Sequence, residues 1–343
     1  MDNFTKKIYT TSRSLSYTYY DSAPGKPVAA HKPTLLFLHG FPDSAYVWKE
    51  VVYHLRTLPH RIILPDLLGF GGSSKPTDPA VFKSNAMAAD LAELLVSEGV
   101  SKIIVIGHDA GSFLAQRMWL WQPQLIVGVA LLNVAYMPPF TIQFDLTTAN
   151  AYFEKATGLP RYAYWEFLTA DDSGKVIDAH LESFWAVLHG FRQGWMRDMF
   201  CVRGAMRDFL EMDRRTELRD FAKPGKGWKE DWMKAVTDGG GLASALSWYK
   251  VVTDNYQYEV EKTLSPERAP ITVPTLFIGC TGDEVALPEM IEENKQAGLV
   301  PHVEIKVLDC GHWCMMEKPD DVAEALLKFL SEHDVGTSQG SSN

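Results

Sequence analysis

Short runs of apolar and β-branched residues recur along the chain, each bounded by Gly, Pro, Asp or Asn. These runs predict buried strands at Thr34–Leu38, Arg61–Leu64, Ile103–Ile106, Leu125–Leu132, Thr275–Ile278 and Val303–Leu308. Helical periodicity between them predicts helices at Ala86–Val96, Ser112–Trp121 and Val322–Leu330. Buried strands that alternate with helices are typical of an α/β fold, a mostly parallel sheet with helices on both faces.

Two segments ahead of these runs alternate apolar and polar residues instead. They are Lys7–Thr11 and Leu15–Tyr20, on either side of Ser12-Arg13-Ser14. Alternation around a short polar turn predicts an antiparallel hairpin at the start of the sheet.

The strand pattern stops between Pro138 and Pro270. This stretch is rich in aromatic residues and Met, with helical spacing in Tyr162–Thr169, Val176–Leu188 and Leu242–Thr253. Pro138-Pro139 marks its start, and Gly239-Gly240-Gly241 predicts a hinge or loop inside it. An insertion of this size between two strands predicts a helical lid over the sheet.

The insertion divides the chain into two parts. We expect a core formed by residues 1–137 and 271–335, and a helical cap formed by residues 138–270. The Gly- and Ser-rich segment 336–343 is expected to be disordered.

Composition narrows the class of protein. The 343 residues are 46% hydrophobic and 22% charged, which excludes disordered, collagen-like and coiled-coil chains. The formal net charge of −10 opposes binding to nucleic acids or anionic membranes. The polar segment Met1–Ser16 has no apolar leader, and no later segment offers a membrane span. We therefore expect a soluble, cytoplasmic protein.

Neither cysteines nor glycines indicate a metal or a cofactor. Cys310, His312 and Cys314 cluster, but no second Cys/His pair completes a four-ligand zinc site, so we expect packed free thiols. The glycines of Gly69-Phe70-Gly71-Gly72 do not form the dinucleotide-binding pattern. We expect a tight structural loop there.

The sharpest motif follows the predicted strand Ile103–Ile106. The sequence Gly107-His108-Asp109-Ala110-Gly111 leads from that strand into a helix. This is the context of a nucleophile elbow, in which glycines flank a strained turn that raises the central side chain above the sheet. An Asp stands here where a Ser is usual. The alternative is an aspartate that only caps the helix.

Candidate groups for chemistry at this elbow follow three other predicted strands. His39-Gly40-Phe41-Pro42 follows a strand and predicts an oxyanion hole made by the N–H groups of Phe41 and Ala110, or simply an X-Pro turn that could be cis. Asp283 and His312 follow the two last strands, in the chain order nucleophile, acid, histidine. Glu284 is a competing acid, and Asn133 occupies another strand end. We prefer Asp283.

Together these residues resemble the α/β-hydrolase superfamily, specifically its epoxide hydrolase and haloalkane dehalogenase branch, over nearly the whole chain. The resemblance implies that Asp109 is the nucleophile, His312 the general base and Asp283 its orienting acid. A carboxylate that attacks saturated carbon forms an ester that water can cleave, whereas a serine would form a stable ether.

Groups that stabilise the leaving atom separate the members of this branch. Haloalkane dehalogenases carry a Trp, and fluoroacetate dehalogenases carry arginines, just after the nucleophile; this chain has Ala110, Ser112 and Phe113. Epoxide hydrolases use two lid tyrosines. The resemblance assigns these to Tyr164, preferred over Tyr162 by its spacing, and to Tyr249 in a Trp-Tyr-Lys segment.

We therefore expect a cofactor-free and metal-free epoxide hydrolase that converts an apolar epoxide into a vicinal diol. Tyr162 and three tryptophans are candidate wall residues of the pocket: Trp48, Trp165 and Trp313. Ala110 in place of Trp widens the pocket or alters the substrate preference. The alternatives are a hydrolytic dehalogenase, a catalytically silent ligand-binding protein, and an ester or lactone hydrolase, which would have to pass through an unfavourable anhydride.

Overall fold

A computed structural model gives the structure of the protein and describes residues 3–23 and 32–333. One eight-stranded sheet lies at its centre, with strand order β1-β2-β4-β3-β5-β6-β7-β8. The strands are β1 Thr5–Thr10, β2 Ser16–Asp21, β3 Thr34–Leu38, β4 Ile62–Pro65, β5 Ile103–His108, β6 Ile126–Leu132, β7 Thr275–Cys280 and β8 Val303–Leu308. The segment 336–343, which we expected to be disordered, lies outside the described residues.

The sheet is mostly parallel, which confirms the predicted fold class. β1 and β2 form an antiparallel hairpin, and β2 pairs antiparallel with β4. All pairs from β4 to β8 are parallel. β5 is buried along its whole length, which explains the apolar run Ile103–Ile106 in its sequence.

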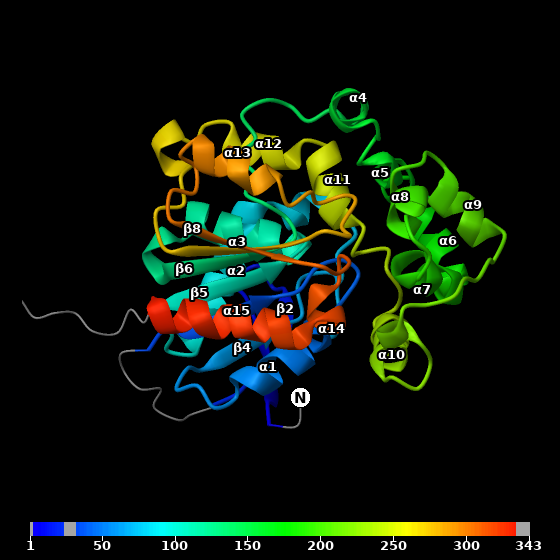
Figure 1. The fold of residues 1–343 in the computed structure, drawn as a ribbon. Helices are drawn as coiled ribbons and strands as arrows, with labels where there is room; N and C mark the ends of the chain where they lie inside the picture. The colour runs from blue at the N-terminus through cyan, green and yellow to red at the C-terminus, as the bar shows by residue number, and fades with distance from the viewer. Residues whose placement is uncertain (1–2, 24–31, 334–343) are drawn as a thin grey trace, which may run out of the picture.

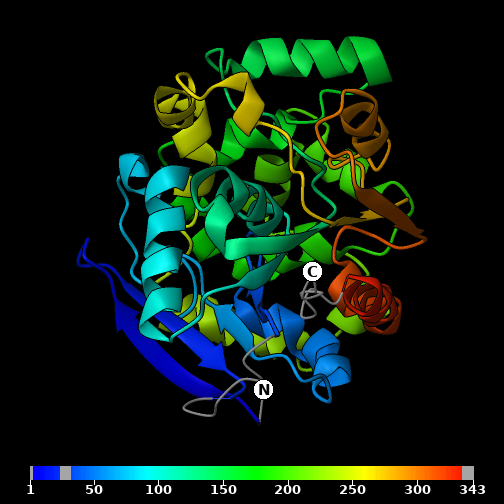
Figure 2. The ribbon, with the colours of Figure 1, turned by 90° about the vertical axis from the view of Figure 1, so that its left-hand side faces the viewer.

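Helices cover both faces of the sheet (Figures 1 and 2). α1 Lys49–Leu55 packs with α15 Pro319–Glu332 on one face, and α2 Ser84–Ser97 packs with α3 Ala110–Trp121 on the other. The remaining core elements are α13 Met290–Gln296, α14 Cys314–Glu317 and the 3-10 turns η1 Ala45–Trp48, η2 Pro79–Phe82 and η3 Pro123–Leu125. The 3-10 turn η5 Pro266–Arg268 lies between β6 and β7, shortly before β7 begins.

The segment between β6 and β7 is helical, and most of it lies to one side of the sheet (Figure 1). Its elements are α4 Leu146–Thr157, α5 Ala163–Leu168, α6 Ser173–Ala179, α7 Leu181–His189, α8 Trp195–Phe200, α9 Ala205–Glu211, η4 Asp220–Ala222, α10 Trp228–Asp238, α11 Ser247–Thr253 and α12 Tyr256–Glu261. The predicted helix Val176–Leu188 is two helices, because His180 leaves the helical region with φ −132° and ψ 37°. The predicted helix Leu242–Thr253 begins only at Ser247.

The end of this segment is tied to the core by a buried ion pair. Arg117 on α3 donates two hydrogen bonds to Glu261 on α12, at 2.8 and 3.0 Å, and both side chains are fully buried. Glu261 also accepts a hydrogen bond from the Phe140 N–H. The beginning and the end of the helical segment thus meet at one carboxylate.

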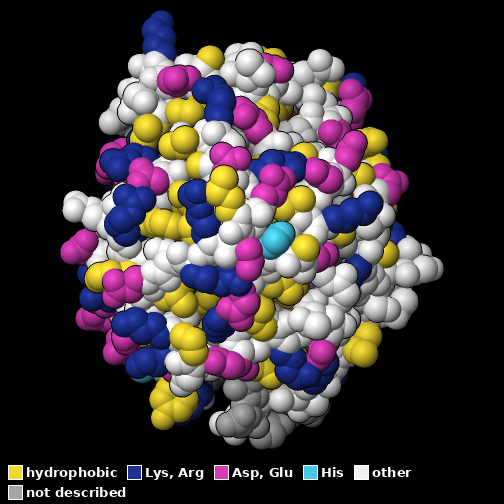
Figure 3. All heavy atoms as spheres, turned by 90° about the vertical axis from the view of Figure 1, so that its right-hand side faces the viewer, with side chains coloured by type: hydrophobic (Ala, Val, Ile, Leu, Met, Phe, Trp, Pro, Cys, Tyr) yellow, Lys and Arg dark blue, Asp and Glu magenta, His cyan; other side chains and the backbone are white. Residues whose placement is uncertain are grey.

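Seen from the side of the helical segment, the surface intersperses Lys and Arg with Asp and Glu (Figure 3). Charges of one sign do not gather into a broad field on this face. Within residues 3–23 and 32–333, no helix combines the length and the apolar character that crossing a bilayer requires.

Candidate active site

Asp109 lies in a strained turn between β5 and α3. Its φ of 52° and ψ of −118° are unfavourable for a residue with a side chain, and such strain persists only where the surroundings enforce it. Two glycines permit the close packing around it. A Cβ on Gly111 would lie 2.2 Å from the Leu38 carbonyl oxygen, and one on Gly40 would lie 2.5 Å from the Asp109 Cβ. The sharp bend therefore holds the carboxylate above the end of the sheet.

The carboxyl ends of neighbouring strands bring the predicted groups together. The Phe41 N–H, after β3, donates to Asp109 Oδ1 at 2.9 Å. His312, after β8, has its Nε2 3.6 Å from Asp109 Oδ2 and its Nδ1 2.6 Å from Asp283 Oδ2. The three side chains thus form a chain from Asp109 through the imidazole to Asp283. The Phe41–Pro42 peptide bond is cis.

Asp283 is held by hydrogen bonds on both of its oxygens. Its Oδ1 accepts from the N–H groups of Val285 and Ala286, at 3.0 and 2.9 Å, and its Oδ2 accepts from Asn133 Nδ2 at 2.8 Å. The competing acid, Glu284, pairs instead with Arg161 at 2.8 Å. Asn133 therefore supports the acid rather than replacing it.

The charges of the site shift its pKa values in a consistent way. Burial alone lowers the pKa of His312, but the adjacent carboxylates of Asp283, Asp109 and Asp43 outweigh it and raise that pKa to about 9. Burial opposes ionisation of Asp283, yet His312 and the surrounding donors hold its pKa below the usual value. Burial raises the pKa of Asp109, although His312 and the N–H groups of Phe41 and Ala110 counteract part of the rise.

Asp43 and His108 belong to the site but were not identified from the sequence. Asp43 is 4% exposed, accepts a hydrogen bond from Trp313 Nε1 at 3.0 Å, and has its pKa raised to about 7 by burial. The His108 ring packs 4.7 Å from that of His312, and its Nε2 donates to the His312 carbonyl oxygen at 2.9 Å. In the sequence, Asp43 directly follows Pro42 and His108 directly precedes Asp109. This adjacency to the two motifs is the signal that could have identified them.

Two tyrosines of the helical segment line the same two cavities as Asp109. Tyr164 on α5 and Tyr249 on α11 are each 9% exposed, and their rings meet edge to face at 6.0 Å. Burial raises the pKa of both hydroxyls well above the usual value, and the negative charge of Asp109 adds to the rise. Both hydroxyls therefore keep their protons at neutral pH.

Two apolar cavities meet at Asp109. The larger, with about 860 Å³ of empty space that includes part of the open solvent, is lined by Asp109, Ala110, Phe113, Val134, Ala135, Met137, Tyr162, Tyr164, Trp165, Trp248, Tyr249, Val252, Val285, Ala286, Leu287 and Met290. The smaller has about 350 Å³ by the same measure and is lined by Phe41, Asp109, Tyr164, Leu168, Phe184, Leu188, Met196, Phe200, Met206, Tyr249, Val285, His312 and Trp313. Neither lining contains Lys or Arg.

The expected wall residues do not all lie at these cavities. Tyr162 and Trp165 stack at 5.0 Å on the wall of the larger cavity, and Trp313 lines the smaller one. The expectation for Trp48 is wrong. Its ring is fully buried in the core, edge-on to Phe37 on β3 at 5.1 Å. The sequence around a Trp near a motif is the same whether its ring faces the cavity or the core, so the sequence alone does not distinguish the two positions.

The cysteines near His312 make contacts with neighbouring side chains. The four cysteines are buried free thiols. Cys310 contacts Cys280 at 3.6 Å and Cys314 contacts Asn133 at 3.5 Å, while both nitrogens of His312 face carboxylates.

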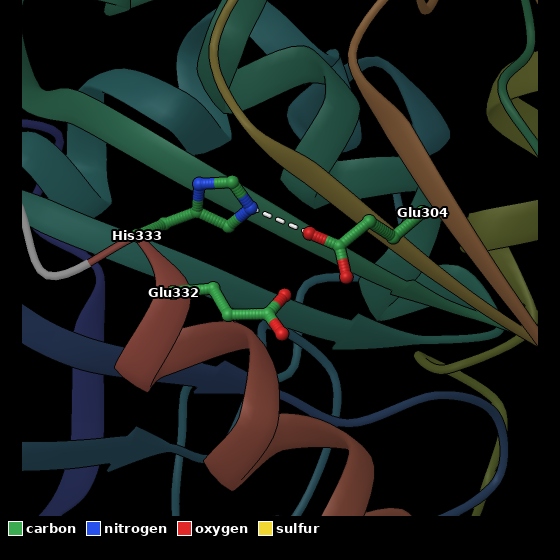
Figure 4. A group of neighbouring side chains, drawn as sticks. All are labelled: Glu304, Glu332 and His333. Atoms are coloured by element: carbon green, nitrogen blue, oxygen red, sulfur yellow. Dashed lines mark hydrogen bonds and ion pairs between the residues drawn. The ribbon is translucent and has the colours of Figure 1, made fainter.

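Among the described residues, one other group of potential ligands lies close together: Glu304, Glu332 and His333 (Figure 4). Glu304 lies near the start of β8, at the opposite edge of the sheet from Asp109, and is hydrogen-bonded to His333. We assign this group no part in the chemistry at Asp109.

Comparisons with known proteins show similarity over nearly the whole chain. Epoxide hydrolase A of Mycobacterium tuberculosis is 26% identical over 312 residues, which span 90% of this chain and 92% of that protein. A fluoroacetate dehalogenase of a Burkholderia species is 28% identical over 319 residues, which span 91% of each chain. The crystal structure of epoxide hydrolase A from Mycobacterium thermoresistibile matches with a TM-score of 0.76 at 24% identity, over 96% of this chain and 98% of that one.

A family model described as the alpha/beta hydrolase fold matches residues 33–319. This range includes β3 to β8 and every residue that lines the two cavities. The chain belongs to the alpha/beta hydrolase fold family.

Proposed function

We propose that the protein hydrolyses apolar epoxides to vicinal diols through a covalent ester on Asp109. One observation carries this proposal: Asp109 lies at the junction of two apolar cavities, with His312 on one side and the buried hydroxyls of Tyr164 and Tyr249 opposite. The names of the epoxide hydrolase relatives support the same reaction.

In the first step, an Asp109 carboxylate oxygen attacks one carbon of the oxirane ring. The carbon–oxygen bond of the ring breaks, and its electron pair moves to the ring oxygen. Tyr164 and Tyr249 donate hydrogen bonds to that oxygen, and one of them transfers its proton. Tyr164 is a better donor than Tyr162, because it lines both cavities with Asp109 and Tyr249, whereas Tyr162 lines only the larger one.

In the second step, water cleaves the ester. Neutral His312 removes a proton from water at Nε2, and the hydroxide attacks the carbonyl carbon of Asp109. Asp283 holds Nδ1 and stabilises the imidazolium that forms. The N–H groups of Phe41 and Ala110 bind the developing oxyanion. The ester bond then breaks, the diol leaves with a proton, and the carboxylate and the tyrosine hydroxyl are restored.

A hydrolytic dehalogenase is the second candidate, because the fluoroacetate dehalogenase relative is 28% identical over 319 residues. The same Asp109 ester would form with release of halide. Two features disfavour this reaction: Ala110 offers no indole N–H to a halide, and neither cavity lining contains a Lys or Arg side chain for a carboxylate substrate.

The test measures diol formation from styrene oxide and halide release from haloalkanes and fluoroacetate. We expect diol without halide, and an initial rate reduced about a thousandfold or more in Asp109→Asn. Asp238→Asn, at an exposed position on α10, is the matched control and should retain the wild-type rate. Halide release without diol would favour the dehalogenase, and an Asp109→Asn variant with the wild-type initial rate would remove the nucleophile from the scheme.

A further inference from the structure

The two cavities share the reacting groups but differ in their other walls. Asp109, Tyr164 and Tyr249 line both cavities. Ala110 lines only the larger cavity, and His312 lines only the smaller one. A substrate whose oxirane ring lies between Asp109 and the tyrosines therefore has Ala110 on one side and the general base on the other.

The cavities also differ in the room they leave. The centre of a water molecule can reach about 110 Å³ of the larger cavity and about 20 Å³ of the smaller. Since roughly 10–15 Å³ suffices to hold one water molecule, the smaller cavity can hold water but leaves little room for a bulky group. The larger cavity can accept a much bigger apolar group.

Ala110 contributes directly to this difference. It is the first residue of α3, directly after Asp109, and it lines the larger cavity together with the aromatic side chains of Phe113 and Trp165. A larger side chain at this position would extend into the space beside the attacked carbon. The smaller cavity is narrowed instead by bulky residues, among them Leu188 and Met196.

We propose that the two cavities have separate tasks: the larger one holds a single bulky apolar substituent against Ala110, and the smaller one holds the water that His312 activates. The inference rests on the proposed epoxide hydrolysis and names its substrate class. The substrates are oxiranes with one aryl or branched alkyl group, and epoxides with bulky groups on both carbons are excluded. The water at His312 also stays in place while the substituent is bound.

The first experiment compares kcat/KM of the wild-type protein for propylene oxide, styrene oxide and trans-stilbene oxide. We expect styrene oxide to exceed trans-stilbene oxide at least tenfold, because the second phenyl ring would have to enter the smaller cavity and displace the water. Equal or faster hydrolysis of trans-stilbene oxide overturns the inference but leaves the proposed function intact. Hydrolysis of none of the three overturns the proposed function itself.

The second experiment changes each cavity separately. Ala110→Trp should lower the ratio of kcat/KM for styrene oxide to that for propylene oxide at least tenfold, and Ala110→Leu should lower it less. Met196→Ala, which enlarges the smaller cavity, should raise the ratio of trans-stilbene oxide to styrene oxide. If both Ala110 variants leave the first ratio at its wild-type value, or Met196→Ala leaves the second unchanged, the separation of tasks is wrong.

Discussion

His312 lies among carboxylates whose combined charge decides its protonation state. With Asp283 at 2.6 Å and Asp109 at 3.6 Å, its pKa is raised to about 9, so the free protein holds an imidazolium at neutral pH. This charge favours ionised Asp109, which suits the attack on the epoxide. In the proposed reaction, ester formation removes the negative charge of Asp109, so the pKa of His312 should then fall toward the value that a general base needs.

The pH dependence of ester hydrolysis follows from this change of charge. The rate constant of the second step should rise with pH and level off with a midpoint below 9, because the ester no longer contributes its charge to the His312 pKa. Rapid-mixing measurements of single turnovers at a series of pH values would give this midpoint. A midpoint at or above 9, or a rate that falls as pH rises, would show that neutral His312 is not the base.

Asp43 should also affect the midpoint of the pH dependence of ester hydrolysis. Its negative charge raises the pKa of His312, so Asp43→Asn should move the midpoint of ester hydrolysis to lower pH. The amide oxygen can still accept the hydrogen bond from Trp313. Because Asp43 itself has a pKa of about 7, the two proteins should differ most above pH 7. An unchanged midpoint would mean that Asp43 only anchors the indole.

Sequence motifs predicted that Asp109, Asp283 and His312 lie close together, because each residue follows a strand and parallel strands end at one edge of the sheet. The roles of Asn133, Asp43 and His108 depend on side-chain contacts between elements far apart in the chain. A pattern of residue types holds no information about such contacts, and the burial of Trp48 in the core escaped prediction for the same reason.

Among the secondary-structure elements, the strands were easier to predict than the cap helices. Buried parallel strands such as Thr34–Leu38 are continuous apolar runs. Thr34–Leu38 and Val303–Leu308 have the predicted bounds, although Val303–Leu308 contains Glu and Lys and is only partly buried. Five helices between β6 and β7 were not predicted: α4, α8, α9, α10 and α12. α4 has one buried residue, Asn150, so it lacks an apolar stripe, and α8 is only six residues long. Short helices held by tertiary packing leave little periodicity in the sequence.

The buried pair between α3 and α12 gives a prediction for stability. Glu261→Ala would leave Arg117 charged and without its carboxylate in the interior, so the free energy of unfolding should fall by about 3–5 kcal/mol. Asp238→Ala breaks an exposed pair with Lys234 and should cost about 0.3–0.5 kcal/mol. Urea denaturation of both variants measures the two values. Similar losses in the two variants would contradict a special role for the buried pair.

For the molecule as a whole, the strand order explains why one edge of the sheet carries the chemistry. β3, β5, β6, β7 and β8 are consecutive neighbours, so the groups that follow them converge at one place although some are far apart in the chain. Asp43 and Trp313, for example, are 270 residues apart. The helical segment between β6 and β7 then places Tyr164 and Tyr249 opposite that edge. The sequence predicted the order of these elements. The unequal sizes of the two cavities depend on how the elements pack, so they could not be predicted from the sequence.

The most direct test of the covalent scheme is one turnover of styrene oxide, with protein in excess, in water labelled with heavy oxygen. Proteolysis and mass spectrometry then locate the label. The scheme predicts one heavy oxygen in the carboxylate of Asp109 and an unlabelled diol, because the oxygen added to the substrate comes from the protein. A labelled diol together with an unlabelled Asp109 would show that water attacks the epoxide directly and would contradict the ester intermediate.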